Sequence, residues 1–241
     1  MVESNPVQGK ETLGPQPLLR DVLADLTFKP GRVLPAHVEA INLGVFQDEA
    51  RKIANQCFLA PANEVVAKII YTTGEGKVLV PRNAFQGNRI GVVADGVVSL
   101  APKVIAKENK LKYRYIAAYM HAVGNTNLNF SSALGYLLLN DNSMAVNVCA
   151  FIVGRTKNTL YFRGQNSPQL DEKEVGEKIR LWIFQRNERL KQVIKPEMDQ
   201  EEKNSIDDKV DKVLVKQICL KYDLQRFSGD SFDAVLTRQN P

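Results

Sequence analysis

Hydrophobic residues recur at helical spacing through the first quarter of the chain. From residue 18 to residue 26 they are three or four positions apart, which predicts a helix that ends at Pro30. The same period predicts a helix from Pro35 through Ile41, another over residues 47–58, and a fourth from Pro61 to Gly74. The chain is therefore expected to open with a run of helices.

The period changes after Gly74, where short segments rich in β-branched residues follow. They cover residues 77–80, 89–94 and 96–100. Asp95 and Gly96 separate two valine pairs, and an Asp-Gly pair accepts the positive φ angles of a two-residue hairpin turn. This pattern predicts a small β-hairpin or three-stranded patch.

The centre of the chain is depleted of charge. Residues 116–154 carry a single charged side chain, Asp141, although charged residues make up 24% of the protein. We interpret residues 103–123, 131–139 and 143–153 as helices, the last two nearly without charge and therefore buried on most sides. They are the predicted centre of the core, and a strand is expected at residues 159–162.

Two amphipathic helices are predicted in the C-terminal third. Asp171 and Glu174 have the spacing of a capping box, and an apolar stripe follows them until Pro196. Ser205 and Asp208 are predicted to open the second helix. Residues 171–241 contain 14 basic and 15 acidic residues, so this pair is expected to pack on the core or on a neighbouring subunit.

These patterns together predict a mainly helical (α+β) fold. It has a helical core, a small β-hairpin patch in the middle and an amphipathic helical pair near the C-terminus. The predicted organisation is a flexible arm (1–17), a core domain (18–168), a C-terminal helical region (169–225) and a flexible tail (226–241).

The composition narrows the class of protein. Of 241 residues, 44% are hydrophobic, which is ample for a sizeable core. Three distant cysteines without C-x-x-C spacing argue against a disulfide framework and favour a reducing compartment, the cytoplasm or a virion. The N-terminus lacks the apolar run of a signal peptide, and no apolar stretch is long enough to span a bilayer.

Positive charge lies on both sides of the neutral centre. Residues 66–115 carry nine basic and three acidic residues, a net charge of +6, and Arg155, Lys157 and Arg163 add three more positive charges. If residues 103–115 are helical, four of their cations form one stripe that can follow a phosphate backbone, and the nearby tyrosines can stack on bases. The predicted nucleic-acid-binding residues are Arg82, Arg89, Lys103, Lys107, Lys110, Lys112, Tyr113, Arg114, Tyr119, Arg155, Lys157 and Arg163.

Other motifs are weaker. The Gly74 to Lys77 turn lacks the glycine and the Ser or Thr of a phosphate-binding loop. Asp207, Asp208 and Asp211 have the D-D-x-x-D spacing that can hold magnesium, but lysines are interspersed and the pattern is that of a charged helix face. With two histidines in the chain and no nucleophile motif, we predict no cofactor, metal or catalytic residue.

The sequence therefore predicts a non-enzymatic protein that binds single-stranded RNA (or DNA) and assembles with itself, of nucleocapsid or coat type. Two alternatives stay open. One is a transferase-like small-molecule enzyme with a site near Asn125, Asn127 and Asn129, and the other is an adaptor whose C-terminal helices bind another protein.

Overall fold

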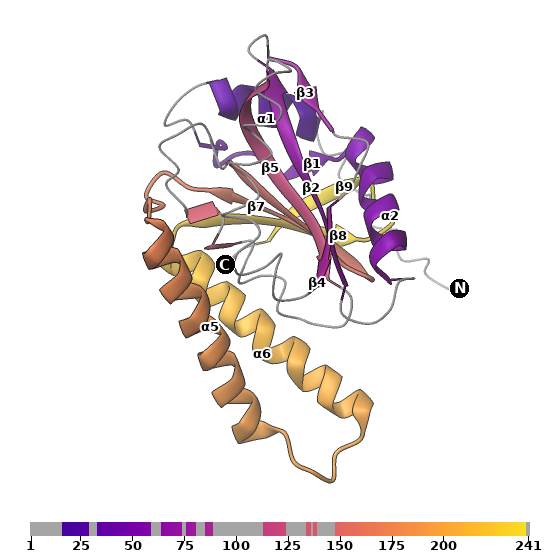
Figure 1. Cartoon of the computed structure of the whole chain (residues 1–241), viewed down its shortest axis with the longest axis vertical. Helices are drawn as coiled ribbons and strands as arrows, with labels where there is room; N and C mark the ends of the chain where they lie inside the picture. Colours follow the sequence, from indigo (N-terminus) through magenta and orange to yellow (C-terminus); the bar gives the residue numbers. More distant parts are fainter. Residues whose placement is uncertain are drawn as a thin grey trace, which may run out of the picture.

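One mixed β-sheet forms the centre of the protein, and helices pack on both of its faces (Figure 1). The computed structural model describes residues 16–28, 33–58, 64–73, 76–80, 85–88, 113–123, 134–135, 137–138 and 148–239. Every structural statement below concerns this part of the chain.

Nine strands of the described part form the sheet. They are β1 (Ala40–Asn42), β2 (Glu64–Thr73), β3 (Val78–Leu79), β4 (Phe85–Asn88), β5 (Tyr113–Val123), β6 (Cys149–Val153), β7 (Lys157–Arg163), β8 (Leu224–Asp230) and β9 (Val235–Gln239). Their order is β1-β9-β8-β7-β6-β5-β2-β3, and β4 also pairs with β2. Among these pairs, β5 and β6 run parallel and the others antiparallel.

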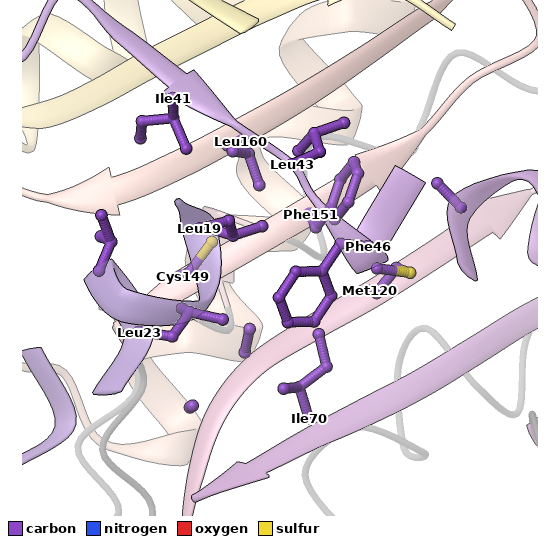
Figure 2. Close-up of a cluster of buried hydrophobic side chains, with 14 of the residues drawn as sticks. Leu19, Leu23, Ile41, Leu43, Phe46, Ile70, Met120, Cys149, Phe151 and Leu160 are labelled. Carbon is purple, nitrogen blue, oxygen red and sulfur yellow. The ribbon is translucent and has the colours of Figure 1, made fainter. Parts of the chain in front are cut away.

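Helices α1 (Leu19–Phe28) and α2 (Val45–Phe58) cover one face of the sheet. Figure 2 shows Phe46 at the start of α2 among side chains of the strands below it, such as Ile70 and Phe151. All three are buried. Because Phe151 alternates with residues that face the opposite side, β6 separates two hydrophobic layers.

Helices α5 (Glu172–Val193) and α6 (Gln200–Lys221) pack on the other face and project beyond the sheet as a hairpin (Figure 1). Trp182 and Ile218 contribute to the second hydrophobic layer, together with Tyr161 of β7. None of the described helices combines the length and the apolar character needed to cross a membrane.

An ion-pair cluster joins α5 and α6. The Arg186 guanidinium, 7% exposed, donates to Asp211 at 2.6 Å and to Asp207 at 2.9 Å. Burial raises the pKa of Asp211 to about 6, and the neighbouring Asp207 and Asp208 act in the same direction, against the hydrogen bond and charge of Arg186. The D-D-x-x-D motif therefore holds a guanidinium between helices.

The prediction of a mainly helical core is wrong. Residues 64–73, 113–123 and 149–153 were expected to be helical, and they are β2, β5 and β6 at the centre of the sheet. All five residues of β6 are buried, because helices cover both faces of the sheet. A strand buried on both faces is apolar at every position and lacks the alternation that distinguishes it from a buried helix.

The boundaries near both ends also need correction. Residues 40–42, within the second predicted helix, form the edge strand β1. Helix α6 begins after Asp199, whose capping box with Glu202 replaces the predicted start at Ser205. Residues 226–239 belong to β8 and β9 and the turn between them instead of a flexible tail.

Several local predictions are confirmed. The first helix, the helix that ends at Phe58, the strand around residues 159–162 and the capping box at Asp171 are all present. The Asp95-Gly96 hairpin, residues 1–15 of the arm and the asparagine-rich turn at residues 125–129 lie outside the described residues.

Candidate functional site

A pocket of about 280 Å³ lies at one end of the sheet, between the C-terminal half of α2 and two β-turns. One turn joins β6 to β7 and the other joins β8 to β9. The residues that line the pocket are Ala50, Arg51, Ala54, Asn55, Phe58, Val153, Gly154, Arg155, Asn158, Ser231 and Phe232.

Helix α2 shapes one wall through the spacing of its residues. Ala50 and Ala54 are one turn apart, and their small side chains leave room between the helix and the sheet. Arg51, Asn55 and Phe58 recur at spacings of four and three, so they lie along one helix face beside the alanines. The helix thus supplies a cation, an amide and an aromatic ring to the same space.

The β6–β7 turn positions Arg155. Gly154 donates its N–H to the carbonyl oxygen of Lys157 at 3.0 Å, which closes a tight turn around Arg155 and Thr156. A Cβ atom at residue 154 would lie 2.4 Å from that same oxygen, so the turn requires glycine. The Arg155 side chain is consequently presented at the tip of a fixed hairpin.

The β8–β9 turn presents Phe232, which is 77% exposed. Its neighbour Ser231 donates its N–H to the carbonyl of Thr156 at 2.9 Å, so the two turns are joined. The Gln47 side chain donates to the Phe232 carbonyl at 2.6 Å, which ties the turn to α2. The backbone that carries this exposed aromatic ring is therefore held from two sides.

Two arginines give the pocket its positive charge. The Arg155 guanidinium lies 5.1 Å from the centroid of the Phe58 ring and has no carboxylate partner among the described residues. Arg51 is 3.6 Å from Asp48, and both side chains are exposed, so this pair contributes little. Both guanidinium groups can bind an anion at the mouth of the pocket.

Asn158 lines the pocket from β7 and is 1% exposed. Its Nδ2 donates to the carbonyl of Ser231 at 3.2 Å, whereas its Oδ1 accepts no hydrogen bond from any described residue. A buried acceptor without a partner costs about 1–3 kcal/mol.

The structure places two of the predicted nucleic-acid-binding residues at this end of the sheet, Arg155 in the β6–β7 turn and Lys157 at the start of β7. Arg163 lies at the opposite end of β7 and donates to the carbonyl oxygens of Ser167 and Pro168 at 3.4 and 3.0 Å. Burial lowers the pKa of Arg163. This arginine supports the following loop, and the structure separates it from the other two cations.

Three more predicted residues, Tyr113, Arg114 and Tyr119, lie in β5. The predicted helical stripe of cations over residues 103–115 does not extend to Arg114. This residue lies in a strand, where side chains repeat with a period of two. Because β5 runs parallel to β6, the strand begins with Tyr113 and Arg114 at the end of the sheet opposite the pocket. Arg82, Arg89, Lys103, Lys107, Lys110 and Lys112 lie outside the described residues.

Five residues that line the pocket were not predicted from the sequence: Arg51, Asn55, Phe58, Asn158 and Phe232. The sequence of α2 contained an indication of this site. Arg51, Asn55 and Phe58 recur at spacings of four and three beside two alanines, a pattern that indicates a polar helix face next to a gap. The indication at Phe232 was weaker: it is a large aromatic residue within a turn that contains Ser and Asp.

Other reactive groups of the described residues lie outside the lining of this pocket. Lys68 of β2, 2% exposed, pairs with Glu49 of α2, and this buried contact joins the helix to the sheet. Burial raises the pKa of Glu49, but hydrogen bonds from Lys52 and Lys68 outweigh it and hold the pKa below its usual value. Burial raises the pKa of the Cys219 thiol to about 12, which leaves it protonated at neutral pH.

Metal binding has no support in the described part of the chain, where no three His, Cys, Asp or Glu side chains cluster. Comparison with known proteins finds no matching family model, no matching curated protein and no matching solved structure. The candidate site is consequently defined by its own residues.

Proposed function

We propose that this protein binds single-stranded RNA or DNA at the pocket between α2 and the two β-turns. The observation that carries the proposal is that Arg155, without a carboxylate partner among the described residues, shares this pocket with the exposed ring of Phe232. Single-strand binders combine these two elements, a cationic path for the phosphates and aromatic rings on which bases stack.

The chemistry of the lining favours binding over catalysis. The described residues that line the pocket are arginines, amides, aromatics, a serine and small apolar residues, without a His, Cys, Asp, Glu or Tyr that could exchange a proton with a substrate. Arginine binds phosphate through paired N–H groups and stays charged at any physiological pH. Arg51 of the same pocket and Lys157 at the start of β7 add positive charge near Arg155.

Self-assembly of nucleocapsid or coat type stays a prediction. The tail that was expected to tie copies together is part of the central sheet, so it is not available for exchange. The projecting α5–α6 hairpin is the remaining described element for self-association, and Leu181, Phe184 and Leu220 are exposed on it. The adaptor alternative would use the same hairpin.

The first test is the salt dependence of binding to a fluorescent single strand of about twelve nucleotides, within the site sizes of single-strand binders. Each neutralised phosphate contributes about 0.7 to the log-log salt slope, so about four to six contacts give a slope of roughly 3 to 4. Arg155→Ala is expected to weaken binding and to lower the slope by about 0.7, measured by fluorescence anisotropy.

The matched control is Arg180→Ala, which removes an exposed arginine from α5 on the other face of the sheet. It makes the same change in net charge and is expected to leave both affinity and slope nearly unchanged. Equal effects of the two substitutions, or a flat salt dependence of the unaltered protein, contradict the proposal.

A further inference from the structure

We infer that the pocket takes one unpaired base of the bound strand, stacked on Phe232, while Arg155 contacts the adjoining phosphate. This inference rests on the proposed function and deepens it, because phosphate binding alone needs no pocket. Three observations support it: the exposure of Phe232, the placement of Arg155 and the size of the pocket.

The first observation is the exposure of the Phe232 ring. A phenylalanine that is 77% exposed contributes almost nothing to the core, and a polar residue would serve the turn equally well. Yet the backbone beneath it is fixed, through Ser231 to the β6–β7 turn and through its own carbonyl to Gln47 of α2. A fixed, solvent-facing ring at a pocket is pre-organised for stacking, since little conformational entropy is lost when a base covers it.

The second observation is the placement of the Arg155 guanidinium. Its guanidinium carbon lies over the Phe58 ring, 5.1 Å from the ring centroid. This contact holds the side chain at the pocket and leaves the N–H groups at the edges of the guanidinium available. A nucleotide offers a partner to each group at the pocket, a phosphate for the N–H donors of Arg155 and a base for the exposed ring of Phe232.

The third observation is the size and polarity of the pocket. A volume of about 280 Å³ is near the lower end of the range for ligand pockets, about 300–1,000 Å³, and so suits one ring system rather than several. Ala50 and Ala54 provide apolar contact for a ring, and Asn55 and Asn158 place amides around it. Mixed apolar and amide surroundings match a nucleobase better than an aliphatic ligand.

A pocket that takes an unpaired base is expected to give the protein a preference for single strands. A base within a duplex is stacked and paired, and extracting it costs a few kcal/mol before it can reach Phe232. A single strand presents its bases without that cost. Duplex of the same sequence is therefore expected to bind more weakly, through phosphate contacts alone.

The deciding experiment compares a base-bearing single strand with a strand of the same length and phosphate charge in which every nucleotide is abasic. For the unaltered protein, removing the bases is expected to weaken binding by about 5- to 150-fold, the range that loss of one stacking contact produces. Phe232→Ala is expected to lose a similar factor with the base-bearing strand, and to respond much less to removal of the bases.

The control is Phe184→Ala, which removes another exposed phenylalanine, 61% exposed on α5, on the opposite face of the sheet from α2. Because α5 is also the candidate element for self-association, the readout is the ratio of the affinities for the two strands, and Phe184→Ala is expected to keep the full response to removal of the bases. If Phe232→Ala fails to fold, the two strands on the unaltered protein still decide the question.

The outcomes separate the two proposals. Equal affinity of the unaltered protein for both strands overturns the base pocket and leaves phosphate binding intact. Failure of both strands to bind at low salt overturns nucleic-acid binding itself. A full response to base removal in Phe232→Ala overturns the role of this ring and places the base contact elsewhere.

Discussion

Replacing Phe227 by alanine is expected to lower the free energy of unfolding by about 3–5 kcal/mol, the cost of removing a buried aromatic side chain. Phe227 of β8 is fully buried, meets Phe162 of β7 edge to face with 5.8 Å between ring centroids, and lies beneath the Arg238 guanidinium. Chemical denaturation followed by tryptophan fluorescence measures this loss, because Trp182 lies in the folded core.

The same β-hairpin offers a matched control. Phe232→Ala removes an identical side chain five residues later, in the turn, where it is exposed, and is expected to change stability by less than about 0.5 kcal/mol. If Phe227→Ala proves equally harmless, β8 is not part of the core and residues 226–239 behave as the tail that the sequence suggested.

Arg186→Ala is the second substitution with a large expected effect. Arg186 is the cation shared by Asp207 and Asp211 between α5 and α6, and its removal leaves the buried Asp211 carboxylate without a counter-ion. Breaking a buried pair in this way costs about 3–5 kcal/mol. The loss is measured at pH 8, where Asp211 is ionised in the unaltered protein because its pKa is about 6.

Lowering the pH should reduce this loss. Burial raises the folded-state pKa of Asp211 above its unfolded value, so the folded state gains stability relative to the unfolded state as pH falls from about 7 toward 4. Protonated Asp211 needs no counter-ion, and Arg186→Ala is therefore expected to cost less at pH 5 than at pH 8. Arg189→Ala, which removes an arginine bonded to the neutral Gln217, should cost little at either pH.

The parts of the fold that could be predicted from sequence are those with one buried face. Helices α2 and α5 show an apolar stripe against polar neighbours, and Asp171 marks the start of α5 by its capping box. The central strands β2, β5 and β6 bury consecutive residues, so they lack the alternation of apolar and polar positions that marks a strand with one exposed face. Their identity depends on pairing with segments distant in sequence.

The candidate site was predictable only in part, for the same reason. Arg155 and Lys157 were predicted to bind nucleic acid because they are close in sequence and form a positive block beside a neutral stretch. Three distant segments supply Arg51, Asn158 and Phe232. The hydrogen bond from Ser231 to Thr156 joins the two turns, and the one from Gln47 to Phe232 joins them to α2. Local pattern cannot show a pocket that tertiary packing assembles.

Photo-crosslinking of the protein to a single-stranded RNA that contains a photoreactive uridine analogue tests the central claim most directly. The crosslinked residues are identified by mass spectrometry after tryptic digestion, in which cleavage after Arg226 and Arg238 isolates the β8–β9 hairpin. The account predicts a crosslink within this peptide at Phe232, which an excess of unlabelled single strand suppresses. Efficient, competable crosslinks confined to other peptides, with none on the β8–β9 hairpin, would contradict it.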